Sequence, residues 1–327
     1  MAPARLSLAA GQPLESAKPM TTIEIRMRVG PEYDGWRLDS YVAAKIPRLS
    51  RARARRLLED GIRSPPGRRL RPGSVVREGL TFSLVRPAPD EPPPPEVPVV
   101  FEDFALVVLD KPPNLAIHPT ARYHRQTLTG FLRGRPGEKA DPAHRIDRET
   151  SGLVLCGKGV HSARLKAAFA RGEVEKRYLA IAAGWPKEER FAIDLPLALG
   201  SGAVRVRMEV GSGKPSRTEV ELLRRFERQG ERFSLFACRP RSGRQHQIRA
   251  HLSAVGHPIV GDKIYGPDEG CFIRFTEGRL SPEDLVRLRL SRHALHAERL
   301  AFAHPATGER LEIASPLPAD LERFLAG

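Results

Sequence analysis

Asp147 lies in a strongly charged stretch of the chain, as the lone carboxylate between Arg145 and Arg148. The tripeptide Thr-Ser-Gly follows at 150–152 and leads into a short apolar run. Neighbouring cations favour the ionised form of an aspartate. A charged loop that enters a buried strand is a usual place for chemistry, because the strand fixes what the loop presents. We therefore expect a strand over Gly152–Cys156 and treat Asp147 as a candidate catalytic carboxylate.

Most clusters of this kind only form salt bridges at a solvated or RNA-facing surface. The order of the residues therefore has to decide whether Asp147 is a salt-bridging aspartate or a catalytic one. The loop reads His144-Arg145-Ile146-Asp147, then Thr150-Ser151-Gly152 and an apolar strand. This order resembles the H-R-x-D-x-x-T-S-G motif of the RluA family of RNA pseudouridine synthases. The resemblance implies that Asp147 is the catalytic nucleophile of an enzyme that acts on RNA.

A second block, Ser242–Leu252, contains an arginine that needs a partner. Ile248, Leu252 and Val255 form an apolar helical stripe, and Arg249 lies just off it. An arginine that points inward is costly to bury without a carboxylate. The block resembles the family segment G-R-T-H-Q-I-R-x-H, with Gln245 in place of the usual threonine. The resemblance implies that Arg249 pairs with the catalytic aspartate.

Tyr178 lies in an expected strand, Glu175–Ile181. A tyrosine in a strand is most often a packing residue. By its K-x-Y context and its position after the Asp147 motif, Tyr178 is similar to the active-site tyrosine of the family. There the ring stacks on the target uracil and is proposed to help remove a proton.

Two further blocks match the same family. Lys111–Pro119 resembles K-P-x-G-x-x-x-H-P, with Asn114 in place of glycine, and Asn tolerates a left-handed backbone next best after glycine. The segment from Arg292 to Glu309 matches the C-terminal region. The resemblance implies an RNA site in which Arg145 and Arg148 hold phosphates or fill the gap left by a flipped base. It implies weaker, loop-shaping roles for His118, His144 and Arg244.

Conversion of uridine to pseudouridine breaks a C–N bond, turns the uracil and forms a C–C bond from C5. No redox step is involved, so we expect no cofactor. We also expect no metal, because the three cysteines are far apart and no carboxylate at ligand spacing completes the pair His293 and His296. The sequence leaves open whether Asp147 attacks C1′, attacks C6 or acts through a glycal.

The composition favours a polyanionic partner. Lys and Arg number 54 against 39 Asp and Glu, which gives a formal charge of +15. No apolar run approaches the ~20 residues of a membrane span, and the N-terminus lacks the pattern of a secretory signal. We therefore expect an RNA-binding monomer in the cytoplasm, with no membrane contact.

The chain divides at a proline-rich linker, residues 87–96, which includes four consecutive prolines. We expect residues 1–20 to be disordered, residues 21–86 to form a small RNA-binding domain and residues 97–327 to form the catalytic domain.

The front domain is expected to hold an arginine-rich helix that begins after the N-cap residue Ser50 and ends near Gly61. This part of the chain resembles the S4 RNA-binding domain, where the helix lies on RNA phosphates. Residues 63–70 replace the hairpin usual in that domain. The resemblance implies phosphate contacts from Arg51, Arg53, Arg55 and Arg56.

These features predict an α+β protein. The catalytic domain is expected to have a mixed, mostly antiparallel sheet with flanking helices, and the S4-like domain to be small and α/β. The substrate is expected to be structured RNA, with large-subunit ribosomal RNA favoured and tRNA as the alternative. Two other functions stay open: a non-catalytic RNA-binding or ribosome-assembly protein on a synthase scaffold, and a glycosylase that releases free uracil.

Overall fold

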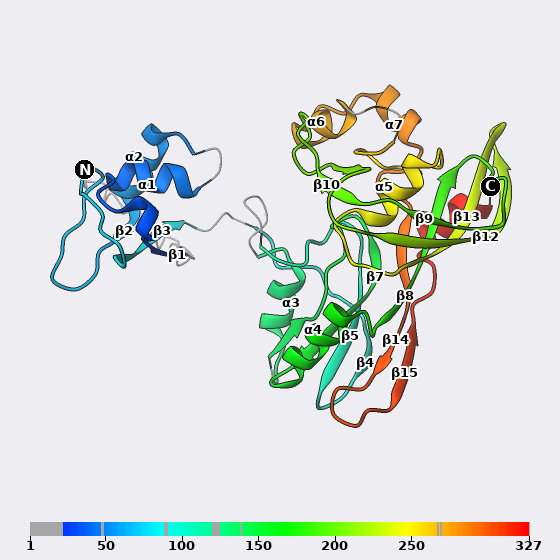
Figure 1. The fold of residues 1–327 in the computed structure, drawn as a ribbon, viewed down its shortest axis with the longest axis horizontal. Coiled ribbons are helices and arrows are strands. Elements are labelled where there is room, and N and C mark those ends of the chain that lie inside the picture. The colour runs from blue at the N-terminus through cyan, green and yellow to red at the C-terminus, as the bar shows by residue number, and fades with distance from the viewer. Residues whose placement is uncertain are drawn as a thin grey trace, which may run out of the picture. The chain divides into compact units, whose positions relative to one another are not determined.

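The chain forms two compact units, divided between Glu91 and Pro92 (Figure 1). The division lies within the proline-rich stretch in which the sequence predicts a linker. The computed structural model describes residues 22–46, 49–87, 91–119, 125–137, 139–266, 268 and 270–326. The predicted disorder of residues 1–20 lies outside the described residues.

The smaller unit packs helices on a three-stranded antiparallel sheet. The strand order is β1-β3-β2, and the elements are β1 (Thr22–Arg28), a 3-10 turn (Pro31–Tyr33), α1 (Leu38–Lys45), α2 (Arg51–Gly61), β2 (Ile62–Arg63) and β3 (Thr81–Pro87). Leu38, Tyr41 and Leu58 are buried in its core. The hydroxyl of Ser50 accepts a hydrogen bond from the backbone N–H of Arg53, so the predicted N-cap of α2 is confirmed.

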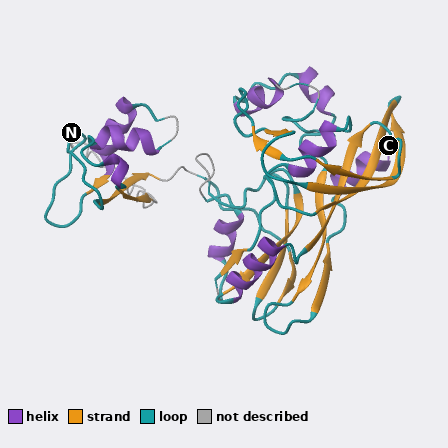
Figure 2. Cartoon of the chain, in the orientation of Figure 1, coloured by secondary structure: helices purple, strands orange, loops and turns teal. Residues whose placement is uncertain are grey.

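The larger unit is organised by one ten-stranded sheet (Figure 2). Its main path is β4-β5-β7-β14-β8-β13-β12-β9, with β15 on β14 and β6 on β7, and only the β7–β14 pair is parallel. The mixed, mostly antiparallel sheet predicted from the sequence is therefore confirmed. Its strands are β4 (Val99–Glu102), β5 (Leu106–Lys111), β6 (Ala140–Pro142), β7 (Ser151–Lys158), β8 (Glu175–Ala183), β9 (Arg190–Asp194), β12 (Arg217–Arg228), β13 (Glu231–Pro240), β14 (Leu295–Ala303) and β15 (Arg310–Ala314).

Helices flank this sheet, and Figure 1 shows α5, α6 and α7 gathered with β10 at one end of the larger unit. The helices are α3 (Leu128–Gly134), α4 (His161–Arg171), α5 (Gln247–Ala254), α6 (Gly270–Thr276), α7 (Pro282–Leu288) and α8 (Ala319–Ala326). A separate ribbon pairs β10 (Leu197–Leu199) with β11 (Met208–Val210). The strand β11 begins only at Met208, because the backbone N–H of Arg207 turns back to the carbonyl of Val204.

The close approach of the neighbouring strands β7 and β14 explains the glycine in the Thr-Ser-Gly tripeptide. Gly152 has φ +107°, and a Cβ at this position would lie 2.3 Å from the carbonyl oxygen of Ala297. Only glycine adopts this conformation readily and leaves room for the neighbouring backbone. The start of β7, and with it the loop that carries Asp147, is thereby fixed against β14.

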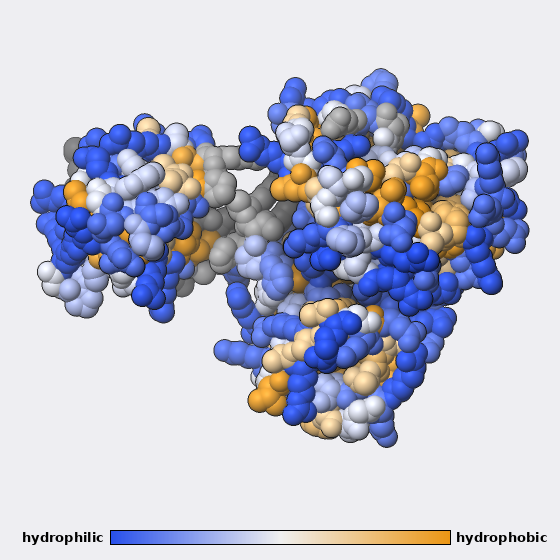
Figure 3. Space-filling view, viewed as in Figure 1, coloured by the Kyte–Doolittle hydropathy of each residue, from blue (hydrophilic) through white to orange (hydrophobic). Residues whose placement is uncertain are grey.

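The molecular surface agrees with the charge of the sequence. Figure 3 shows a visible face on which hydrophilic residues predominate on both units, with only scattered apolar patches. Within the described ranges, no helix is long and apolar enough to cross a membrane.

Candidate active site

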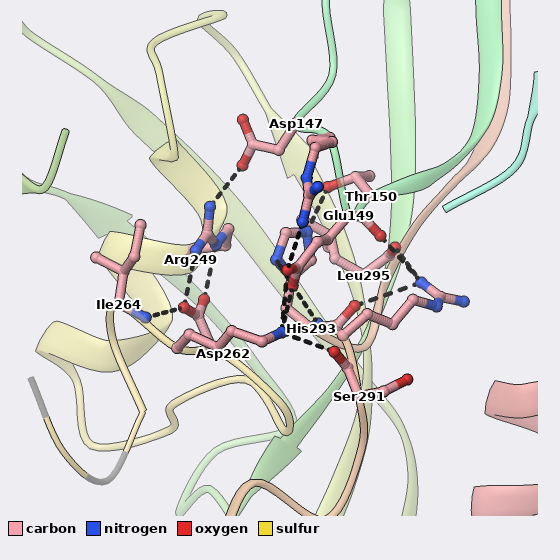
Figure 4. A network of polar contacts seen from close by, with 12 residues as sticks. Asp147, Glu149, Thr150, Arg249, Asp262, Ile264, Ser291, His293 and Leu295 are labelled. Carbon is pink, nitrogen blue, oxygen red and sulfur yellow. Dashed lines mark hydrogen bonds and ion pairs between the residues drawn. The ribbon is translucent and has the colours of Figure 1, made fainter. Parts of the chain in front are cut away.

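The guanidinium of Arg249, on α5, lies between two carboxylates (Figure 4). Its Nη1 donates a hydrogen bond of 2.8 Å to Oδ2 of Asp147. Its Nε and Nη2 form a two-pronged pair with the carboxylate of Asp262, at 2.7 and 2.8 Å. Arg249 is only 4% exposed. The sequence predicted one carboxylate partner for a buried arginine at this position, and the structure shows two.

This arrangement keeps Asp147 ionised. Burial acts to raise the pKa of Asp147, but the charges of His246, Arg249 and His293 act against it and lower the pKa to about 2. Burial lowers the pKa of His246 to about 4 and that of His293 well below its ordinary value, so both imidazoles are neutral at pH 7. The permanent positive charge that acts on the Asp147 carboxylate is therefore that of Arg249, which lies 102 residues away in the sequence.

Asp262 is the counterpart that holds Arg249 in place. Its side chain has no exposed surface, and its Oδ1 also accepts hydrogen bonds from the backbone N–H groups of Ile264 and Tyr265. Burial would raise the pKa of Asp262, but Arg249 and the backbone N–H of Ile264 are among the groups that lower it instead. Asp262 is thus a buried anion with several partners, and it aims the remaining N–H of Arg249 at Asp147.

Buried side chains also fix the loop that carries Asp147. The Nζ of Lys263 donates to both carboxylate oxygens of Glu149, at 2.9 and 3.0 Å. The hydroxyl of Thr150 shares a 2.7 Å hydrogen bond with Nε2 of His293. The Nζ of Lys111, which is fully buried, donates to the carbonyl oxygen of Arg148 at 3.1 Å. The loop is therefore held on several sides, which suits a group that must be positioned within fractions of an ångström.

Asp147 retains 19% exposure and opens onto two hollows that share part of their lining. One hollow has a volume of about 550 Å³ and is lined by Asp147, Tyr178, His246, Arg249 and Leu295, together with Arg145 and Arg244. The structure thus brings the three residues predicted to be catalytic to one concave site. We call it the Tyr178 hollow.

The remaining predicted contacts occupy different places. Arg145 is exposed and borders both hollows. Arg148 does not line the Tyr178 hollow and borders only the other hollow beside Asp147. His144 lines the Tyr178 hollow, but it stacks on Phe169 at 4.3 Å and its Nε2 accepts from the N–H of Leu155. Burial lowers its pKa to about 3, so it is a neutral, loop-supporting residue.

The arginines predicted to bind RNA on the front helix lie in the smaller unit. Arg51 approaches the buried carboxylate of Asp39 at 3.3 Å, and Arg55 pairs with Glu59 at 2.9 Å. Arg56 is exposed on the same helix. These pairings leave the helix rich in exposed cations, two of which are partly neutralised.

Comparison with known proteins agrees with this geometry. The family model described as RNA pseudouridylate synthase matches residues 105–254. Ribosomal large subunit pseudouridine synthase D of Zymomonas mobilis subsp. mobilis is 33% identical over 310 residues, which cover 89% of this chain and 93% of that protein. Its namesake in Pseudomonas aeruginosa is 33% identical and covers 88% and 91%. The solved structure of Human RNA Pseudouridylate Synthase Domain Containing 1 is 29% identical, with a TM-score of 0.55 over 69% of this chain and 86% of that one.

The chain belongs to the RNA pseudouridine synthases of the RluA type. It is therefore an enzyme that isomerises uridine in RNA. The hypothesis of a non-catalytic RNA-binding protein is set aside by this membership.

Sequence reasoning gave no role in the site to several residues that lie within, or shortly after, the stretches that had been singled out. Asp262 follows the α5 block, His246 is inside it, and His293 belongs to the C-terminal block. The useful signal was the buried arginine, since an arginine has five donors and one carboxylate cannot satisfy them all. That count requires a second acceptor, but sequence spacing does not say which one.

The Asp147–Arg249 pair predicts how the rate of the synthase depends on pH. In the wild type, Asp147 is ionised above about pH 2, so the single-turnover rate should not fall between about pH 8 and pH 5. In Arg249→Met, no permanent cation opposes the effect of burial, and the pKa of Asp147 should rise above its ordinary value of about 3.9. We expect the rate of this variant to fall as the pH is lowered within that range.

Asp262→Asn is the matched control. It keeps the cation of Arg249 beside Asp147 but removes the carboxylate that positions it. The rate should therefore stay independent of pH and fall roughly 10²-fold throughout, because the guanidinium is less precisely placed. Rate profiles of the same shape in Arg249→Met and the wild type would show that Arg249 does not ionise Asp147.

Proposed function

We propose that this synthase converts specific uridines of large-subunit ribosomal RNA to pseudouridine, with Asp147 as the nucleophile and without a cofactor. The observation that carries the proposal is the partly exposed Asp147 carboxylate, held ionised by Arg249 at 2.8 Å at the mouth of a hollow. The choice of RNA is supported by relatives that are named for the ribosomal large subunit and align over most of the chain.

The target uridine must leave its stack to reach Asp147. Unstacked bases of RNA are commonly held against aromatic side chains. Tyr178 is half-buried in the wall of the Tyr178 hollow and packs against the two main cores of the unit, so its ring is a rigid platform. We propose that the flipped uracil stacks on Tyr178, while Arg145 at the rim contacts the RNA strand or fills the gap that the base leaves.

The chemistry proposed for Asp147 requires its charged form. Attack at C1′ forms a glycosyl ester and releases the uracil anion. The uracil turns, and its C5 displaces the Asp147 carboxylate from C1′ as the ester bond breaks; loss of the C5 proton and protonation of N1 then complete pseudouridine. Attack at C6 or removal of a sugar proton are the two alternative routes, and each also starts from the carboxylate. A single protein chain supplies Asp147, Tyr178 and Arg249, so the proposal requires only a monomer, acting in the cytoplasm where ribosomal RNA is found.

The hydroxyl of Tyr178 is suited to orient a reactant and unsuited to accept a proton at neutral pH. Burial and the nearby charge of Asp147 raise the pKa of Tyr178 above its ordinary value. Arg249, the cation that would have to lower it, is already engaged by two carboxylates. We propose that the protonated hydroxyl positions a water molecule or the uracil itself when the C5 proton leaves.

We propose that residues 21–86 form the S4-like RNA-binding domain, joined to the catalytic domain (97–327) by the linker 87–96. Exposed arginines on α2, among them Arg51, Arg55 and Arg56, would then contact phosphates. Helix α2 is N-capped by Ser50 and packs on a core through Ala54 and Leu58, which leaves its arginine-bearing side exposed.

The function is tested by mapping pseudouridines in the RNA of cells that lack the protein. Sites in large-subunit ribosomal RNA should be lost, and the wild-type chain should restore them. Asp147→Asn keeps the size of the side chain but not its charge, so it should bind RNA and restore none. Loss of sites in tRNA alone would favour the alternative substrate, and turnover by an Asn protein free of deamidation would exclude Asp147 as the nucleophile.

Tyr178→Phe separates the ring from the hydroxyl. The phenylalanine keeps the platform, so RNA affinity and folding should be unchanged. The single-turnover rate should fall, by up to the roughly 10²–10⁴-fold that assistance to proton transfer contributes. If the Phe variant reacts as fast as the wild type on the mapped RNA, Tyr178 contributes stacking alone.

Deletion of residues 1–95 tests the front domain and spares Val97, which is buried in the catalytic core. The truncated enzyme should fold and bind RNA more weakly. The slope of log affinity against log salt should become shallower by about 0.7–0.9 for each phosphate contact removed. The double change Arg55→Gln, Arg56→Gln in the full chain should reproduce part of this effect, whereas an unchanged slope in both proteins would place α2 away from RNA.

A further inference from the structure

The second hollow beside Asp147 has no role in the chemistry described so far. It has a volume of about 470 Å³ and one of its walls is formed by Phe272, Phe275 and Thr276 of α6. We call it the α6 hollow. The rest of its lining includes Ala116, His118, Arg148, Val206, Gln245 and Ile264.

The α6 hollow is continuous with the Tyr178 hollow. Arg145, Ile146, Asp147, His246 and Arg249 border both of them. A ligand that fills one hollow therefore lies next to a ligand in the other, and Asp147 borders both.

The lining of the α6 hollow combines an aromatic face with positive charge. The ring of Phe275 lies 5.5 Å from the guanidinium of Arg148 and 4.7 Å from Nζ of Lys263. The charge of Lys263 is balanced by Glu149, while Arg145 adds an exposed cation at the rim. Aromatic rings and arginines together are the groups that hold single-stranded nucleotides, by stacking on the base and pairing with the phosphate.

The wall is built as a fixed element. Arg274 of α6 pairs with Asp268 and with Asp284 of α7, and its Nε donates a 2.7 Å hydrogen bond to Oδ2 of Asp284. Ser281 and Asp284 form a capping box that starts α7. Cys271 is the buried residue of α6 itself and anchors the helix to the unit. The two short helices therefore brace one another, and the aromatic wall is ready before any ligand binds.

We propose that the α6 hollow binds the nucleotide immediately next to the target uridine, so that α6 selects the RNA sequence around the target. This inference rests on the proposed function, because a flipped uridine in the Tyr178 hollow is what brings a neighbouring nucleotide to the α6 hollow. The base of that nucleotide stacks against Phe275, and its phosphate lies toward Arg145 and Arg148.

The test is a thermodynamic cycle between the protein and the RNA. The probe is a synthetic fragment around the uridine identified by mapping, prepared intact and with an abasic nucleotide on the 5′ or the 3′ side of that uridine. Against the wild type, one of the two abasic fragments should bind roughly 5- to 160-fold more weakly, which is the contribution of one base stacked on an aromatic ring. The rate at saturating enzyme should be unchanged, because the neighbour does not touch the reacting bond.

Phe275→Leu removes the ring. It should weaken binding of the intact fragment by the same factor and show no further loss with the abasic one. Phe275→Tyr keeps the ring and should behave as the wild type. Ile273→Ala is a matched control on the same helix, since Ile273 is 37% exposed and lies outside the lining of the hollow, and it should leave affinity and rate unchanged.

Independent losses would overturn the inference: if Phe275→Leu and the abasic change weaken binding additively, the base does not lie on Phe275. A fall in the saturated rate of Phe275→Leu without such coupling would show that the ring only supports the Asp147 loop. Reaction of the wild type on the intact fragment is the internal check of the proposed function, so the two failures are distinguishable.

Discussion

The burial of one positive charge between two negative ones governs the construction of this site. Arg249 is 4% exposed, and its environment would be strongly unfavourable without Asp147 and Asp262. Breaking a buried pair of this kind by removal of one partner costs about 3–5 kcal/mol, because the other charge stays behind without compensation. Three separate segments must therefore converge: the loop before β7, helix α5 and the turn that carries Asp262.

The same requirement accounts for the polar groups around the loop. Lys263, His293 and Lys111 hold the Asp147 loop through Glu149, Thr150 and the carbonyl of Arg148. Each of these groups is itself buried, so the network loses free energy if the loop moves. The result is a carboxylate whose position and charge are set before RNA binds, which is how electrostatic preorganisation lowers a barrier.

Local pattern predicted much of the fold. Periodicity and capping located α2 and α5, and the strands expected at Gly152–Cys156 and Glu175–Ile181 correspond to β7 and β8, because each of these signals lies within a few residues. The partnership of Arg249 and Asp147 was also expected, from the resemblance and from the cost of a buried arginine. The second acceptor, Asp262, was not, since its role depends on a turn after α5 that no periodicity predicts. The wall formed by α6 was missed as well, because residues 268–290 are less recognisable in the sequence and their position beside Asp147 depends on the fold.

The ionisation of Asp147 can be measured directly by ¹³C NMR titration of the aspartate carboxyl groups, with Asp147→Asn to assign the resonance. Because its pKa is lowered in the folded state, this ionisation stabilises the fold above the unfolded pKa of about 3.9, and the contribution is lost as the pH falls toward 2. The carboxyl resonance of Asp147 should therefore keep its ionised shift from neutral pH to below about pH 3, and move only as the pH approaches 2. A midpoint at or above the ordinary value of about 3.9 would contradict the account, because it would mean that Arg249 does not hold Asp147 in its charged form.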